Sequence, residues 1–148
     1  MKIFLAAPIF SLAEREFNSK LAEELRKRGH DVFLAQELGI LDTPSEDVKR
    51  KLFEEDLKAL DGSDVVVAVL DGMEVDSGVA FELGYAYARG KKIVGVRTDH
   101  RCFSPYEEVN LMIEVPSEIV KGKSIDEIVE GIEEKLEEKL QGMKDDNA

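Results

Sequence analysis

Residues 64–70 read DVVVAVL, a continuous apolar run introduced by one aspartate. A run of this length, rich in valine, is typical of a strand that is buried on both faces, as in parallel sheets. Residues 1–7 (MKIFLAA), 31–35 (DVFLA) and 92–96 (KIVGV) have the same character, and residues 111–115 (LMIEV) form a weaker fifth candidate. The sequence therefore predicts five strands of a parallel sheet.

Segments with helix start and stop signals lie between these runs. Ser11 and Glu14 can form a capping box for a helix that ends near Arg28, where Gly29 follows as a stop signal. Three more helices are expected: one from a start signal at residues 43–46 (TPSE, with Thr43 as the N-cap and Pro44 in the first helical position) to about residue 60, one over residues 78–89, and one from a cap formed by Ser124 and Glu127.

Strands and helices thus alternate about five times along the chain. Parallel strands are joined by right-handed crossovers, which are usually helices. We therefore expect an α/β protein with a three-layer, doubly wound (flavodoxin-like) five-stranded parallel sheet. Residues 1–143 are expected to form a single domain and residues 144–148 a frayed tail. Ligands of such sheets bind beyond the carboxyl ends of the strands, which here are followed by residues 6–10, 35–39, 70–78 and the chain from residue 97 onward.

The composition excludes several classes of protein. The 148 residues hold 20 lysines and arginines against 32 aspartates and glutamates, a formal charge of −12. Such a chain repels phosphate backbones and anionic lipid, so neither nucleic acid nor a membrane is expected as its partner. The single Cys102 excludes an internal disulfide, and no apolar run approaches the roughly 18 residues of a spanning helix. We expect a soluble, cytoplasmic protein.

Several catalytic motifs are missing from the sequence. It contains no G-x-G-x-x-G after the first strand, no G-x-x-x-x-G-K-[ST] and no G-x-S-x-G. These absences argue against a dinucleotide enzyme, a P-loop enzyme and an esterase. His100 and Cys102 are the only close pair of soft metal ligands, and without a second pair they favour a surface loop over a zinc site. No metal or cofactor is expected.

Two acidic residues stand out from the solvated majority. Asp56 extends the apolar stripe of Val48 and Leu52 on the second predicted helix. Glu82 lies within the small-residue string GVAFELG, near the N-terminus of the third helix, whose dipole favours an ionised carboxylate. An oriented, ionised carboxylate is the form of a nucleophile that attacks an anomeric carbon. The alternative for each is a capping or salt-bridged acid.

The string around Glu82 resembles a known family signature. Residues 76–85 read DSGVAFELGY, which is similar to the signature of the nucleoside 2-deoxyribosyltransferase family. The resemblance spans nearly the whole chain and includes residues 8–10 (PIF), the pair Asp56–Leu57 and residues 110–112 (NLM). It implies an enzyme of deoxynucleoside salvage that transfers 2-deoxyribose between a deoxynucleoside and a free nucleobase.

The resemblance also implies roles for individual residues. Glu82 matches the glutamate that attacks C1′ and carries the deoxyribose as an ester, and Asp56 matches an acid that helps to protonate the departing base. Asp76 matches a ligand of the sugar 5′-hydroxyl. Asn110 matches a second 5′-hydroxyl ligand, supplied by a neighbouring subunit of a homo-oligomer, and Met112 would line that shared pocket.

Three more residues are implied as substrate contacts. Phe10 would pack on the base, Gln36 would contact the edge of the base, and Gly78 would border the substrate. For Phe10, as for Met112, the alternative is an ordinary place in the core. Asp76 would repel a 5′-phosphate and accept a hydrogen bond from a 5′-hydroxyl, which favours nucleosides over nucleotides.

One position departs from the family pattern, and three functions stay open. Phe4 stands where the family often has a tyrosine that orients the nucleophile, so Glu82 needs another donor, for which Tyr85 and Tyr87 are candidates, or acts without one. The first function is deoxyribosyl transfer. The second is hydrolysis of the N-glycosidic bond of 2′-deoxynucleosides or their 5′-monophosphates, and the third is nucleotide binding without turnover.

Overall fold

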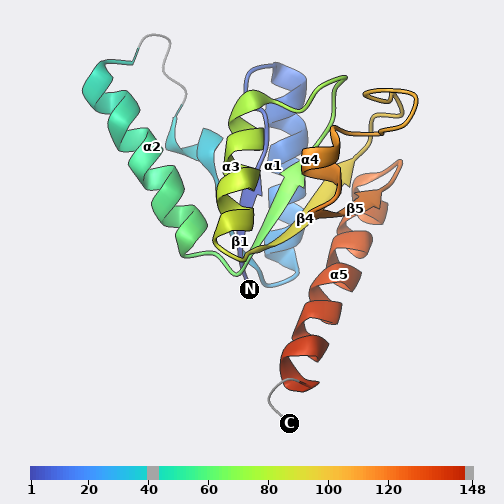
Figure 1. Cartoon of the computed structure of the whole chain (residues 1–148). Coiled ribbons are helices and arrows are strands. Elements are labelled where there is room, and N and C mark those ends of the chain that lie inside the picture. Colours follow the sequence, from blue (N-terminus) through green and yellow to red (C-terminus); the bar gives the residue numbers. More distant parts are fainter. Residues whose placement is uncertain (40–43, 146–148) are drawn as a thin grey trace.

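The computed structural model describes residues 1–39 and 44–145. Its centre is one sheet of five parallel strands in the order β2-β1-β3-β4-β5. The sequence prediction of a doubly wound α/β fold is confirmed (Figure 1). The strands are β1 (Lys2–Ala6), β2 (Asp31–Leu34), β3 (Val65–Val69), β4 (Lys92–Arg97) and β5 (Ser117–Lys121).

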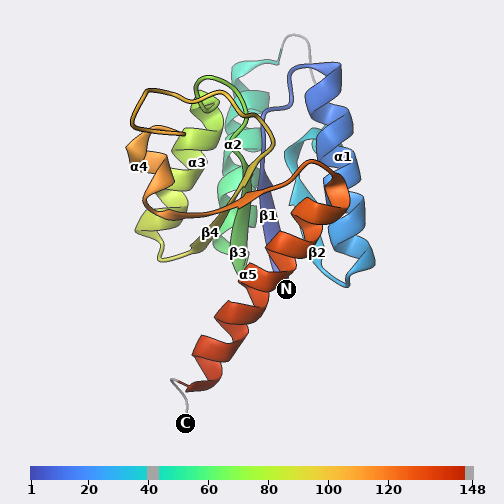
Figure 2. The same ribbon diagram turned by 90° about the vertical axis from the view of Figure 1, so that its right-hand side faces the viewer.

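Helices cover both faces of this sheet (Figure 2). They are α1 (Leu12–Lys27), α2 (Glu46–Asp61), α3 (Ser77–Ala88), the short α4 (Leu111–Glu114) and α5 (Ile125–Asp145), with a 3₁₀ turn, η1 (Ala35–Leu38), after β2. Helices α1 and α5 pack on one face, while α3 packs on the other with α2 and α4 beside it. None of the helices in the described ranges is long and apolar enough to cross a membrane.

The strands are buried on both sides because successive side chains point to opposite faces. Ile3 and Leu5 of β1 pack against α1 and α5, whereas Phe4 and Ala6 pack against α3. All five residues of β3 are buried. Continuous apolar runs, rather than alternating ones, therefore mark the interior strands.

Two of the predicted helix starts have the expected caps. At α1 the backbone N–H of Glu14 donates to Ser11 Oγ at 3.1 Å, and the N–H of Ser11 donates to Glu14 Oε2 at 2.8 Å. At α5 the N–H of Glu127 donates to Ser124 Oγ at 3.2 Å.

The start of α2 differs from the prediction. Ser45 is its N-cap and accepts a hydrogen bond from the N–H of Val48 at 3.3 Å, so Pro44 precedes the helix instead of occupying its first position. Thr43, the predicted N-cap, lies outside the described residues.

The prediction of a strand at residues 111–115 is wrong. Asn110 accepts a hydrogen bond from the N–H of Met112 at 3.0 Å and thereby caps α4, and the fifth strand follows at Ser117–Lys121. This edge strand carries serine, glutamate and lysine among its five residues, so it has no continuous apolar run to reveal it.

The C-terminal end of the chain also departs from the expected frayed tail. Helix α5 continues through Lys144 and Asp145, which the sequence analysis assigns to that tail. Residues 146–148 lie outside the described part of the chain.

Candidate active site

The order of the strands defines where a ligand site is expected. The chain moves outward from β1 to β2 on one side and from β3 to β4 and β5 on the other, so the direction reverses between β1 and β3. Doubly wound sheets bind ligands at this reversal, beyond the carboxyl ends of the strands. The loop after β1 carries Phe10, and the loop after β3 leads through Asp76 into α3.

Asp76 is held at the start of α3. Its Oδ2 accepts a hydrogen bond from the N–H of Val79 at 3.0 Å, which makes it the N-cap of the helix. A Cβ atom at Gly78 would lie 3.1 Å from the same oxygen, tighter than ordinary contact. The small residue after Ser77 therefore leaves room for the Asp76 carboxylate.

Glu82 lies about one and a half turns further along α3 and is half-buried. Burial first, and then the charges of Asp56 and Asp76, raise the pKa of Glu82 to about 8. Among the described residues, no group donates a hydrogen bond that would favour its ionised form. The structure thus brings the Asp56 carboxylate of another helix to the two acids at the start of α3. The raised pKa favours a protonated Glu82 near neutral pH, so the ionised form that the sequence analysis expects near the helix N-terminus is wrong for the free protein.

Asp56 approaches Glu82 from α2. Its side chain is half-buried, and its Oδ1 is buried without a hydrogen-bond partner in the described part of the chain. Burial, and to a smaller extent the charge of Glu55, raise the pKa of Asp56. A buried carboxylate oxygen without a partner is costly in free energy unless a ligand or a proton satisfies it.

The two tyrosines considered as donors to Glu82 lie elsewhere. The hydroxyl of Tyr85 donates to Asp61 Oδ2 at 3.0 Å, and Tyr87 is 68% exposed on another side of α3. Phe4 is buried and stacks on Phe33 with a centroid distance of 5.3 Å. Glu82 therefore lies beside two acids, Asp56 and Asp76, without a hydrogen bond from a tyrosine hydroxyl.

Phe10 is free to contact a ligand, whereas the side chain of Gln36 is already hydrogen-bonded within the protein. Phe10 is 74% exposed on the loop that follows β1, so its ring is free to meet a ligand. The amide of Gln36 donates to the carbonyl of Arg15 and to Ser19 Oγ, both at 2.9 Å, and accepts from Asn18 at 3.0 Å. Both N–H groups of Gln36 are therefore engaged, and only the second lone pair of its amide oxygen is left for a base edge.

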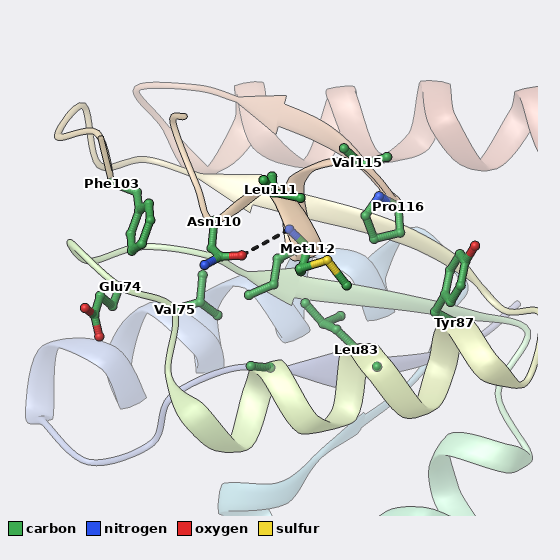
Figure 3. Close-up of a pocket in the computed structure, with 13 residues that line it drawn as sticks. Glu74, Val75, Leu83, Tyr87, Phe103, Asn110, Leu111, Met112, Val115 and Pro116 are labelled. Atoms are coloured by element: carbon green, nitrogen blue, oxygen red, sulfur yellow. Dashed lines mark hydrogen bonds between the residues drawn. The ribbon is translucent and has the colours of Figure 1, made fainter. Parts of the chain in front are cut away.

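Asn110 and Met112 are not beside Glu82 within one chain. Both line a hollow of about 830 Å³ between α3 and α4, to which α3 contributes Ala80, Gly84 and Tyr87 (Figure 3). Glu82 is two residues beyond Ala80, so its side chain points about 200° away around the helix. The carboxylate cluster and Asn110 therefore flank α3 on different sides.

A buried arginine that the sequence analysis does not single out connects two loops of this edge. Arg97, at the end of β4, is 2% exposed and donates to the carbonyls of Leu70, Gly72 and Arg101. Asp71 accepts hydrogen bonds in return from the backbone N–H groups of the loop after β4, at 2.7 and 3.0 Å. The sequence signal is a charge at the end of an apolar strand, KIVGVR.

The fold and this site define an α/β protein with a carboxylate cluster at the edge where doubly wound sheets bind small molecules. The sequence profile of the family described as nucleoside 2-deoxyribosyltransferase matches residues 3–143. The chain belongs to this family, and it is an enzyme.

Individual proteins show the same relationship. A protein of Thermofilum pendens named as a 2′-deoxynucleoside 5′-phosphate N-hydrolase is 30% identical over 139 residues, covering 92% of this chain and 95% of the relative. A solved 2-deoxyribosyltransferase from Bacillus psychrosaccharolyticus has a TM-score of 0.73 at 26% identity, covering 87% of this chain and 90% of the other. A conserved protein from Enterococcus faecalis V583 has a TM-score of 0.72 at 27% identity, covering 91% of this chain and 98% of the other.

Proposed function

We propose that this enzyme cleaves the N-glycosidic bond of 2′-deoxynucleosides, holds the deoxyribose as an ester on Glu82 and transfers it to a second nucleobase. The observation that carries the proposal is the burial of Glu82 beside Asp56 and Asp76. Cleavage of this bond develops positive charge on the sugar, and a fixed group of carboxylates stabilises that charge.

The proton held by the Glu82–Asp56 pair can serve as the proton that the departing base needs. Glu82 must lose its proton to attack C1′, and the departing base must gain one. In our proposal the single proton of the pair passes from Glu82 to Asp56 and from Asp56 to the base nitrogen as the C1′–N bond breaks and the C1′–Oε bond forms. Attack by a second base on the ester reverses these steps, and two displacements at C1′ retain its configuration.

The charge around Glu82 supports an uncharged substrate. A 5′-phosphate bound next to Asp76 would be repelled by that carboxylate, whereas a 5′-hydroxyl can donate to it. The hydrogen bond from the N–H of Val79 to Oδ2 fixes the Asp76 carboxylate at the start of α3. Its oxygens can accept a further hydrogen bond from the 5′-hydroxyl. The exposed ring of Phe10 is the proposed platform for the base, and Gly78 borders the sugar.

Hydrolysis is the second candidate, and the name of the Thermofilum pendens relative favours it. The absence of a hydrogen-bond donor to Glu82 among the described residues also favours it, because a poorly oriented ester has less control over which nucleophile attacks. Water in place of the second base would release free deoxyribose, and Glu82 and Asp56 would keep the same roles.

The position of Asn110 supports a site shared between subunits. Because Asn110 and Met112 lie on another side of α3 from Glu82, we propose that they reach the pocket of a neighbouring copy. Mixing Glu82→Ala and Asn110→Ala proteins under conditions of subunit exchange should then restore part of the activity, since one of the two sites in a mixed dimer carries both wild-type groups. Demonstrated exchange without any regained activity would refute the shared site.

Two assays test the reaction itself. A 2′-fluoroarabinosyl nucleoside should leave a sugar adduct on Glu82, visible by intact mass and peptide mapping, because fluorine slows breakdown of the ester. Glu82→Ala should form no adduct and lose about 10³-fold or more in turnover. An adduct on another residue would refute the assignment of the nucleophile.

The second assay separates transfer from hydrolysis. The enzyme is incubated with deoxyinosine and an excess of adenine, and the products are resolved by chromatography. Formation of deoxyadenosine supports transfer, whereas free deoxyribose at an unchanged rate supports hydrolysis. A parallel reaction with the 5′-monophosphate should be slower, and a faster one would contradict the proposed preference for nucleosides.

A further inference from the structure

Helix α2, which carries Asp56, is held mainly by α3. Within α2, all of which the structure describes, Leu60 is the one fully buried residue. A hollow of about 570 Å³, lined by Phe33, Leu38 and Ala59 among others, separates α2 from the β2 edge of the sheet. Figure 1 shows α2 beside α3, and only the C-terminal end of α2, at Ala59 and Leu60, joins the core that packs on the sheet. The distance between Asp56 and Glu82 therefore depends on the contacts between two helices.

These contacts lie on either side of the carboxylate pair. Phe53 packs against Phe81 with a centroid distance of 6.0 Å, three residues before Asp56 and one before Glu82. Beyond the pair, Asp61 accepts hydrogen bonds from the Tyr85 hydroxyl at 3.0 Å and from Arg89 Nε at 2.8 Å. The guanidinium of Arg89 also lies 5.8 Å from the centre of the Tyr85 ring.

The pair itself repels when both of its members are ionised, because the charge of Asp56 acts on Glu82. Attractive contacts along the interface must therefore offset this repulsion. Asp61 supplies the polar ones through its side chain, and its carbonyl accepts a further hydrogen bond from Lys91 at 2.7 Å.

We infer that the hydrogen bond from Tyr85 to Asp61 is a positioning contact that sets the separation of Asp56 and Glu82 for the reaction. Tyr85 and Asp61 do not touch the substrate in this assignment; they act through the two helices. The inference rests on the proposed function of Glu82 and Asp56. It gives the Tyr85 hydroxyl a role in the reaction although that hydroxyl does not bond to Glu82.

The first test is the Tyr85→Phe variant, which removes one hydroxyl and keeps the ring. The charged groups that act on Glu82 are Asp56 from α2 and Asp76 from the start of its own helix, and Asp61 and Arg89 lie further along the same interface. Without the hydroxyl, α2 relaxes away from α3, and kcat/KM should fall by about tenfold, mainly through kcat, because the reacting groups are misplaced. The pH above which activity is lost should move down by about half a unit, because the charge of Asp56 acts less strongly on Glu82.

Matched variants separate positioning from a general loss of stability. Tyr106→Phe removes the hydroxyl of a tyrosine that is 95% exposed, and it should change neither kcat/KM nor the pH profile. Asp61→Asn keeps an acceptor for Tyr85 and should retain more activity than Asp61→Ala. An unchanged pH profile and kcat/KM within twofold of wild type in Tyr85→Phe would overturn the inference.

A measurement without substrate distinguishes failure of this inference from failure of the proposed function. The Glu82 carboxyl, labelled with ¹³C and assigned by its absence in Glu82→Gln, is titrated by NMR in the wild type and in Tyr85→Phe. The inference predicts a lower pKa in the variant, and an identical pKa overturns it even if the enzyme is active. If the wild type cleaves no deoxynucleoside, the proposed function fails whatever the titration gives.

Discussion

In the proposed mechanism the carboxyls of Glu82 and Asp56 hold one proton between them near neutral pH, which predicts a bell-shaped dependence of kcat/KM on pH. Above the pKa of Glu82, about 8, the pair loses its last proton and cannot protonate the leaving base. At low pH both carboxyls are protonated and no nucleophile remains. The alkaline limb should therefore fall near pH 8. In Asp56→Asn this limb should disappear together with most of the activity, and an unaltered limb would show that another group titrates there.

The same raised pKa predicts an effect of Glu82 on stability. An unfolded chain releases this proton near pH 4.5, whereas the folded chain keeps it to about pH 8, so folding stability falls as the pH rises between these values. Glu82→Gln removes the titrating carboxyl, and with it this loss of folding stability at high pH. Its melting temperature should exceed that of the wild type by about 3 °C or more at pH 8.5 and match it at pH 4. Glu16→Gln, an exposed change on α1, is the control, and an equal gain at both pH values would contradict the argument.

At the scale of elements, Asn110 has one observed role and one proposed role, which can be separated. Its Oδ1 caps α4, and its Nδ2 is left to donate to a ligand in the proposed shared site. Asn110→Asp keeps the capping oxygen and removes the amide donor, so it should melt like the wild type and lose activity. Asn110→Ala removes both and should also lose about 1 kcal/mol of stability, measured by urea unfolding. Full activity in Asn110→Asp would exclude the amide as a substrate ligand.

At the scale of the whole molecule, the face formed by α3 and α4 predicts self-association. Leu111, Met112 and Val115 are 52%, 76% and 81% exposed, and Tyr87 is 68% exposed. Burial of such side chains against a second copy would offset the repulsion between two chains of charge −12. Assembly measured by light scattering should therefore strengthen with added salt, which screens the repulsion.

A charge on this face should disrupt the assembly. Leu111→Lys is expected to give monomers and to lose activity with them, because Asn110 would no longer reach a neighbour's pocket. Leu12→Lys on α1, where the leucine is 65% exposed, is the matched control and should change neither the assembly nor the activity. An active monomeric Leu111→Lys protein would contradict the shared site.

The sequence by itself determined the interior of the fold and the candidate nucleophile. Apolar runs such as DVVVAVL predict buried strands, and Ser11 with Glu14 predicts the start of α1, because both signals depend on neighbours within a few residues. Residues 76–85 indicated Glu82 for the same reason, since the small-residue string and the family signature that it resembles lie within ten consecutive residues.

The tertiary structure alone decided which groups meet. Residues 111–115 are as apolar as a strand, but the capping bond of Asn110 and the adjacent edge of the sheet make them a helix and move the fifth strand to Ser117–Lys121. Tyr85 is three residues from Glu82 but donates to Asp61, and Asp56 reaches Glu82 from another helix. Hydrogen bonds, burial and pKa values depend on what packs against a side chain, and that neighbour is set by the arrangement of the helices around the sheet.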